Sequence, residues 1–446
     1  MHVIADLQLH SRFSRAVSPQ MTLPNIAAWA ARKGIGLVAT GDWMHPIWFR
    51  EIESQLEEQG NGLLKLKPET RNPKPETLFL LATEVSSIYS QGGKVRRVHT
   101  LIWVPTIQSA RKISQEMTKR GCNLMSDGRP IVGLSCIHIA ELVLSIEPKA
   151  LIIPAHAWTP WFSVYGEKGG FESLDEAFGP YAKHIYAVET GLSSNPAMNW
   201  RIKELDHRSI LSFSDAHSGP KLGREATVFN IPEISYEHIY QAIRTQTNIA
   251  YTIEFYPEEG KYHWSGHRAC GIRWGPEDTK VKGTTCPVCG KPLVQGVVQR
   301  VEALAGRSEA DLQLSAISYQ LSDNITIPMT ASKAFPNRPP FVMLVPLQEI
   351  ISECIGSPVG SKKIVPLYDA LVSFPGGEFG VLLTATLEEI TQVAGARIAE
   401  GIDKVRRGDL VIDPGYDGVF GVVKLWREGE EKPLVDASKE QLSMFS

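Results

Sequence analysis

Short apolar runs alternate with helix-like segments through the first 255 or so residues. Runs at residues 3–5, 78–81 and 151–153 have the length and composition of buried strands. Segments 25–33, stopped by Gly34, and 237–244 have helical periodicity. Strands that alternate with helices usually pair in parallel, so this pattern predicts an α/β barrel or an open α/β sheet.

Acidic, amide and imidazole side chains follow these runs. They are Asp6, Gln8, His10, Asp42, Glu84, His99, His156, Asp215 and His217. In α/β barrels, chemistry gathers at the C-terminal ends of the strands. We therefore expect one site that holds several divalent ions, which activate water for attack on phosphorus.

Six short motifs, taken in order, resemble those of the polymerase-and-histidinol-phosphatase (PHP) superfamily. They lie at residues 6–11, 39–42, 83–85, 98–100, 155–157 and 214–217. The resemblance implies a distorted seven-stranded β/α barrel over residues 1–258 with two or three metal ions. The ligands that it implies are His10, Asp42, Glu84, His99, His156, Asp215 and His217, to which we add Asp6 and Gln8. We assign catalytic roles to Glu84, His156, Asp215 and His217.

The chain departs from the superfamily pattern at two positions. Gln8 stands where the first His of an H-x-H pair is usual, which leaves the filling of the third metal site open. Asp42 replaces a second His and favours Mg²⁺ or Mn²⁺, with Zn²⁺ as an alternative. His45 is interpreted as a ligand or an orienting residue, and Glu189 as a ligand, a supporting group or a base.

A second metal motif lies at residues 259–296. His267 and Cys270 are followed, after 15 residues, by Cys286 and Cys289. Two such pairs are typical of a structural Zn²⁺ site, and His263 is an alternative fourth ligand. The other interpretations are a chance pair and a redox dithiol.

An aromatic segment follows His156. Trp158, Trp161, Phe162 and Tyr165 are predicted to bind substrate together with Glu189, by stacking on an extruded base. The alternative interpretation is a packed surface lid.

The sequence of residues 297–430 predicts a mixed α+β domain, which we expect to contact DNA. Strands are expected near 341–345 and 379–383, a long helix at 387–405, and a hairpin at 408–421. The basic residues 404–407 either meet phosphates or complement the dipole of a helix end. In the flexible tail predicted at 431–446, Gln441, Leu442, Met444 and Phe445 resemble a bacterial sliding-clamp-binding peptide.

Composition and charge limit the class of protein to which the chain can belong. The chain has 446 residues, 43% of them hydrophobic, and a formal charge of −3, so total charge does not point to nucleic acid. The sequence shows neither a signal peptide nor an apolar run of about 20 residues, which predicts a cytoplasmic protein without a membrane segment. Six cysteines in this length predict reduced thiols.

The order of barrel, zinc motif and C-terminal domain resembles the endonuclease Q family of DNA-repair enzymes. The resemblance implies nicking of double-stranded DNA 5′ of uracil, hypoxanthine, xanthine or an abasic site, leaving a 3′-hydroxyl and a 5′-phosphate. We also expect a monomer that associates with the nucleoid. The alternatives are a small-molecule phosphoesterase of the PHP type and a DNA-binding protein with weak catalysis.

Overall fold

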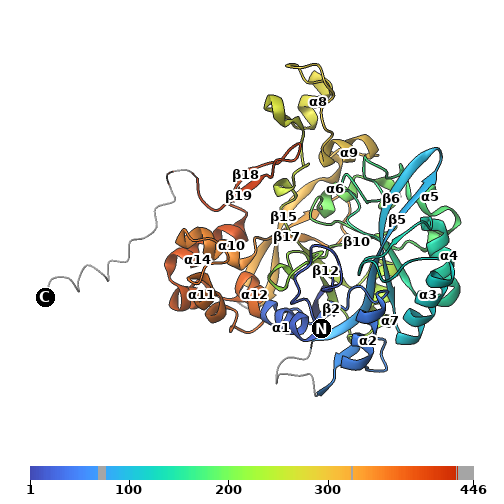
Figure 1. Ribbon diagram of the computed structural model, residues 1–446. Helices are drawn as coiled ribbons and strands as arrows, with labels where there is room; N and C mark the ends of the chain where they lie inside the picture. Colours follow the sequence, from blue (N-terminus) through green and yellow to red (C-terminus); the bar gives the residue numbers. More distant parts are fainter. Residues whose placement is uncertain (69–76, 323–324, 428, 430–446) are drawn as a thin grey trace, which may run out of the picture.

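A computed structural model describes residues 1–68, 77–322, 325–427 and 429 as a mixed α/β structure built on one large sheet (Figure 1). Its central strands run in the order β11-β1-β2-β5-β6-β8. Their bounds are β1 (His2–Asp6), β2 (Leu37–Ala39), β5 (Leu78–Gln91), β6 (Lys94–Val104), β8 (Leu151–Pro154) and β11 (Ala226–Asn230). The chain contains no described helix that is long and apolar enough to cross a membrane.

The sheet is mixed, whereas alternation of strands and helices had predicted parallel pairing. β1, β2 and β5 are parallel neighbours, but β5 and β6 form a long antiparallel hairpin, and β8 and β11 are also antiparallel to their partners. β9 (Ala187–Glu189) and β10 (Ser209–Leu211) form a separate parallel pair. Backbone bonds connect the segment after β8 to β9, and Ser212 after β10 bonds to Thr227 of β11. The closed seven-stranded barrel therefore stays a prediction.

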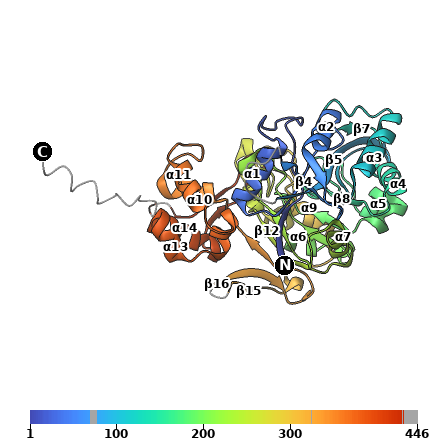
Figure 2. The same ribbon diagram turned by 90° about the horizontal axis from the view of Figure 1, so that it is seen from below.

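Helices cover the outside of this sheet (Figures 1 and 2). They are α1 (Leu23–Lys33), α2 (Pro46–Gln55), α3 (Ile107–Lys119), α4 (Cys136–Ile146), α5 (Leu174–Phe178), α6 (Pro196–Trp200) and α7 (Tyr236–Thr245). Both predicted helices are confirmed: α1 begins with a proline in its first turn and ends at Gly34, whose φ of 82° suits glycine. Ser235 caps α7 by accepting a bond from the His238 N–H.

The sheet continues beyond residue 297, where the sequence predicted a separate domain. β12 (Ile249–Glu254) pairs in parallel with β17 (Phe341–Met343), and β16 (Ile325–Ser332) and β15 (Leu314–Ser322) extend the same edge. β3 (Leu56–Glu58), β4 (Leu64–Leu66) and β7 (Ile131–Val132) complete the sheet near β5. The domain boundaries stay predictions, but this strand pairing joins the segments on both sides of residue 297.

A helical unit follows β17. It consists of α10 (Leu347–Ile355), α11 (Ile364–Leu371), α12 (Gly377–Phe379), α13 (Leu387–Ala394) and α14 (Ala396–Arg407). The predicted single helix at 387–405 is wrong, because Gly395 adopts φ 86° and ψ 162° and separates α13 from α14. The predicted strand at 379–383 is also wrong, since these residues form the end of α12 and a π-helical turn over Gly380–Thr384.

The basic end of α14 is engaged within the chain. Arg406 donates to the backbone carbonyls of Leu382, Val381 and Ala385, and Lys404 pairs with Asp409. These contacts favour a structural helix end over a phosphate-binding one.

The predicted zinc segment contains β13 (Ser265–His267), β14 (Ile272–Trp274) and α8 (Pro276–Lys282), and α9 (Val297–Leu304) follows it. A hairpin is present as β18 (Val411–Asp413) and β19 (Val422–Lys424), but its second strand begins after the predicted range 408–421, and residues 414–421 form its loop. The Trp264 N–H donates to the Gly415 carbonyl, and the Arg268 N–H donates to Asp417. The hairpin therefore packs on the zinc segment, as Figure 1 shows.

Two buried glutamates inside the sheet predict a pH-dependent stability. Burial raises the pKa of Glu254 to about 7 and also raises that of Glu225, and the Glu254 carboxyl accepts a bond from Ser212 Oγ at 2.6 Å. The folded state keeps a proton on Glu254 that the unfolded chain releases near pH 4.5, so this stabilisation is present below that pH and is lost as pH rises through about 7. In chelator buffer, the free energy of unfolding of the parent should fall between pH 5 and pH 8. In Glu254→Gln this fall should be smaller by roughly 1–3 kcal/mol.

Urea unfolding at the two pH values measures this change. Glu237→Gln is the matched control, because Glu237 is an exposed glutamate paired with Lys149 on the surface. An unchanged pH dependence in Glu254→Gln would contradict the assignment.

Candidate active site

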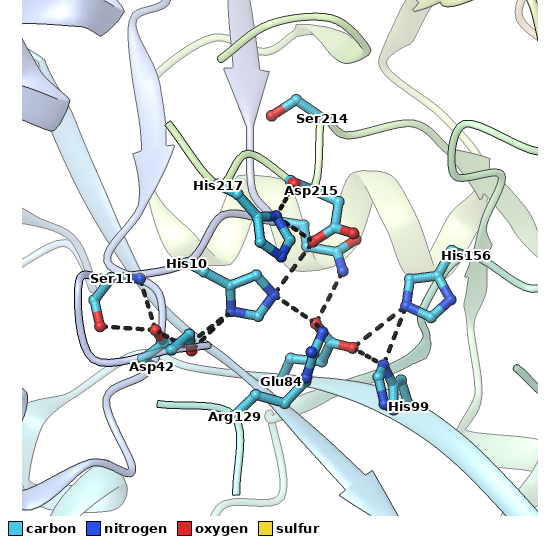
Figure 3. Close-up of polar contacts among 12 residues, drawn as sticks. His10, Ser11, Asp42, Glu84, His99, Arg129, His156, Ser214, Asp215 and His217 are labelled. Carbon is cyan, nitrogen blue, oxygen red and sulfur yellow. Dashed lines mark hydrogen bonds and ion pairs between the residues drawn. The ribbon is translucent and has the colours of Figure 1, made fainter. Parts of the chain in front are cut away.

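Six of the predicted ligands form two groups at the strand ends. In each group the ligand atoms lie within 4.8 Å of one another: His10, Asp215 and His217 make one, and Glu84, His99 and His156 make the other. Figure 3 shows the two groups facing a shared space, with Glu84 between them. Segments as far apart as residues 10 and 217 supply these side chains, so the fold assembles the site.

Glu84 on β5 connects the groups. Its Oε2 lies 2.9 Å from His10 Nε2, and its Oε1 lies 3.3 Å from His156 Nε2 and also contacts His99 Nδ1. A carboxylate that reaches both groups with different oxygens is suited to bridge two cations.

Asp42 orients His10, although the sequence predicted it as a ligand. Its Oδ1 lies 2.9 Å from His10 Nδ1, and its Oδ2 accepts bonds from the Ser11 N–H at 2.6 Å and from the Ser11 and Ser14 hydroxyls. Both carboxylate oxygens are therefore engaged. A carboxylate on one ring nitrogen leaves the other nitrogen as the ligand, which is the usual arrangement for metal-binding histidines.

Asp6 belongs to neither ligand group. Its carboxylate accepts bonds from the Ser214 N–H at 3.0 Å, the Ser214 hydroxyl at 2.6 Å and the Gly223 N–H at 2.9 Å. The structure thus corrects the predicted ligand role: Asp6 fixes the backbone just before Asp215.

Backbone strain gathers at the site. Asp42, His156 and Asp215 have φ values of 45°, 31° and 48°, a region that residues other than glycine rarely adopt. Such conformations persist only where surrounding contacts hold them, and they are often found at functional sites.

The unpaired polar atoms fit bound cations. His10 Nε2 and Asp215 Oδ1 are buried and lie 3.2 Å apart, and Glu84 Oε2 lies 2.9 Å from the same nitrogen, yet neither atom makes a well-aligned hydrogen bond among the described residues. Buried polar atoms without partners are unfavourable, and imidazole nitrogens mixed with carboxylate oxygens are donors that divalent ions accept. A cation between the groups would satisfy these atoms.

The charge states of His99 and Glu84 agree with this fit. Burial lowers the pKa of His99 to about 4, against the opposing effect of Glu84, so its ring is neutral and keeps a lone pair. Burial alone would raise the pKa of Glu84, but His99 and Arg129 hold it well below its usual value. Burial would lower the pKa of His10, but Asp42, Asp215 and Glu84 hold it well above its usual range, so the ring is protonated without a metal, and a bound cation would displace the proton on Nε2.

Of three further predicted residues, Gln8 and Glu189 support the ligands and His45 does not. Gln8 Nε2 donates to Glu84 Oε2 at 3.2 Å, and Gln8 Oε1 is buried without a described partner. Glu189 Oε2 accepts from the His156 N–H at 2.7 Å, and burial raises the pKa of Glu189 well above its usual value. His45 caps α2 and stacks on Phe13, so it belongs to neither ligand group.

Arg129 is a site residue that the sequence analysis missed. Its Nη1 lies 3.6 Å from Glu84 Oε2, and Figure 3 shows the side chain beside the two groups. It lies on the loop before β7 and follows no apolar run, so the strand-end pattern that identified the ligands gave no signal for it.

The aromatic segment divides into two parts. Trp158 and Tyr165 are buried and stacked on each other, with the Trp158 indole N–H donating to Asn199 and the Tyr165 hydroxyl donating to Glu204. This packing corrects their predicted role in stacking on a base. Phe162 lies 4.9 Å from the His99 ring, and Trp161 is 40% exposed, so these two remain available at the mouth of the site.

The four residues of the zinc motif come together as one group. Ligand atoms of His267, Cys270, Cys286 and Cys289 lie within 4.8 Å of one another, and His263 is outside the group. Burial opposes ionisation of Cys286, but the N–H groups of Cys289 and Val288 lower its pKa to about 6. A thiolate is the form that binds Zn²⁺, and this set of three sulfurs and one nitrogen is typical of structural zinc sites.

Comparison with known proteins gives sequence matches to the C-terminal region and to the whole chain. Residues 346–409 match the family model described as the MJ0043 C-terminal domain. The chain is 33% identical to protein MJ0043 of Methanocaldococcus jannaschii over 279 residues, which are 60% of this chain but only 31% of that protein. It is 29% identical to protein YqxK of Bacillus subtilis, over 95% of this chain and 99% of that protein.

Two solved structures are similar over nearly the full length. The lesion-specific endonuclease PfuEndoQ from Pyrococcus furiosus is 31% identical, with a TM-score of 0.79 over 98% of this chain and 99% of that one. Endonuclease Q in complex with a 27-mer duplex substrate carrying an abasic lesion is 32% identical, with a TM-score of 0.78 over 98% of this chain and 100% of that one. The chain therefore belongs to the endonuclease Q family.

Proposed function

We propose that this protein is a metal-dependent DNA-repair endonuclease. It nicks the phosphodiester 5′ of deaminated bases (uracil, hypoxanthine or xanthine) and abasic sites, leaving a 3′-hydroxyl and a 5′-phosphate. The observation that carries the proposal is the pair of ligand groups joined by Glu84, in a chain similar throughout to an endonuclease bound to lesion DNA.

In this proposal, some residues would hold the cations, one would contact the phosphate and others would position the ligands. His10, Asp215 and His217 would hold one cation and Glu84, His99 and His156 another, with Glu84 shared. When bound, such ions activate water for attack on phosphorus and stabilise negative charge on the phosphate oxygens. Arg129, a cation beside Glu84, is placed to contact a phosphate oxygen, and Asp42 and Glu189 hold His10 and His156 in position.

A lesion must leave the base stack to reach a site enclosed in this way. Extrusion of a nucleotide is least unfavourable where pairing is already weak. We therefore expect mispaired uracil and hypoxanthine, as well as abasic sites, to be cut faster than a base in a good pair. Phe162, whose ring lies beside that of His99, and the exposed Trp161 are the aromatic residues that would contact an extruded nucleotide.

The test uses labelled duplexes that carry uracil, hypoxanthine or an abasic site, with Mg²⁺ or Mn²⁺ and with chelator. We expect one nick, 5′ of the lesion, that requires the metal and yields an end that ligase and polymerase can use. Hydrolysis of small phosphomonoesters without nicking would indicate a phosphoesterase. Lesion binding without nicking in any metal would indicate a DNA-binding protein.

Contact with the sliding clamp stays a prediction from sequence. The peptide of Gln441, Leu442, Met444 and Phe445 lies outside the described residues.

A further inference from the structure

The loop of the β18–β19 hairpin presents an exposed aromatic ring. Phe420 is 67% exposed, and Val419 beside it is also exposed. The Lys261 ammonium lies 4.4 Å from the centre of the Phe420 ring, and Arg268, which is exposed, lies beside Gly418 of the same loop. An aromatic ring flanked by cations is suited to stacking on a base while the cations face phosphates.

The loop is braced by backbone hydrogen bonds. The N–H groups of Gly415, Gly418 and Gly421 donate to the carbonyls of Glu258, Lys261 and Glu259 at 2.8–3.1 Å. Tyr416 and Val419 also exchange bonds with each other across the loop. Phe420 is therefore held at a fixed place, so it can act on a bound duplex without first paying the entropy of ordering a loose loop.

An aromatic path connects this loop to the candidate active site. Tyr262, next to Lys261, meets Trp161 edge to face with ring centres 5.1 Å apart. The following residue, Phe162, lies 4.9 Å from the ring of His99. The hairpin loop is thus continuous with the mouth of the site through side chains that can contact bases.

We propose that Phe420 is a wedge that enters the base stack of duplex DNA next to the extruded nucleotide, with Lys261 and Arg268 on the flanking phosphates. This proposal rests on the proposed function. A wedge stacks on bases that lose their neighbour when a nucleotide leaves the helix, so it lowers the free energy of extrusion. A single strand has no paired stack to keep open and needs no wedge.

Phe420→Ala should therefore reduce kcat/KM for a uracil duplex by about tenfold, the size expected for one lost base–aromatic stack. Nicking of the same uracil strand without its complement should stay within about twofold of the parent, because the metal site is untouched. Phe420→Trp should restore duplex nicking. Val281→Ala is the matched control, since Val281 is an 85% exposed apolar residue of the zinc segment.

A fluorescent duplex tests the wedge directly. 2-Aminopurine is placed next to an abasic-site analogue, and binding is followed with Ca²⁺ in place of Mg²⁺. The parent should change the fluorescence at one flanking position, and Phe420→Ala should lose that change while Val281→Ala keeps it. Equal loss of duplex and single-strand nicking in Phe420→Ala, or an unchanged fluorescence response, would overturn the wedge.

Further outcomes distinguish failure of the wedge proposal from failure of the proposed function. A parent dimer that becomes a monomer in Phe420→Ala, with duplex nicking unchanged, would assign the ring to contact between copies of the chain. If the parent nicks no lesion, the proposed function itself is rejected. If the parent nicks normally and Phe420→Ala nicks equally well, only the wedge is rejected.

Discussion

Glu84→Ala is expected to reduce nicking by at least about a thousandfold while lesion binding stays within a few-fold of the parent. Glu84 contacts His10 with one oxygen and His156 and His99 with the other, so its loss removes a donor from both ligand groups. Metal ions contribute several kcal/mol of stabilisation to developing charge in phosphoryl hydrolysis, and that contribution disappears with them. We expect duplex binding to use phosphate contacts outside this carboxylate, so it should persist.

Gel assays give the nicking rate, fluorescence anisotropy gives lesion binding, and titration calorimetry with Mn²⁺ gives the metal stoichiometry. Glu53→Ala is the control, because Glu53 on α2 pairs with the exposed Arg111 away from the site. Asp42→Asn gives a graded comparison: as an orienting residue it should lose about 10–100-fold, less than Glu84→Ala. Near-parent turnover in Glu84→Ala would remove the ligand assignment.

The β5–β6 hairpin shows what the alternation pattern could and could not predict. Helices α1 and α7 follow from local periodicity and stop signals, which act within one element. The antiparallel β5–β6 pair depends on the turn at Gly92 and Gly93, both with positive φ, and this Gly-Gly signal outweighs the expectation of parallel pairing. Gly395 similarly interrupts residues 387–405, whose apolar pattern alone predicts one helix.

The sequence pattern also could not predict which atoms of the candidate site contact one another. Strand-end position identified the residues that gather, but it could not separate the proposed ligands His10 and Asp215 from Asp42, which bonds to His10. That distinction depends on Ser11 and Ser14, whose hydroxyl groups occupy the second oxygen of Asp42. The role of Asp6 depends on Ser214, 208 residues away. Such partners are set by tertiary structure.

The zinc group carries the second large prediction. Cys286→Ser should lower the zinc content of the purified protein from about one ion per chain to near zero, because three remaining ligands hold Zn²⁺ far more weakly than four. The parent ion should survive brief chelation that strips the metals of the active site. The zinc segment has few alternatives to the ion for stability: Cys289, Val281 and Val288 are exposed, and the β13–β14 ladder is only three residues long.

Loss of the ion should therefore unfold residues near 265–293 and remove the bond from the Arg268 N–H to Asp417, which loosens the hairpin loop although its bonds to residues 258–264 remain. Limited proteolysis should show new cleavage in that segment, with solubility reduced and the sheet of β1–β12 still folded, because its core lies elsewhere. Duplex nicking should fall, as we expect for Phe420→Ala, whereas single-strand nicking should be affected less. Cys122→Ser is the matched control, since this half-buried thiol lies outside the zinc group and its loss should leave the zinc content unchanged. Full zinc content in Cys286→Ser would show that another set of residues holds the ion.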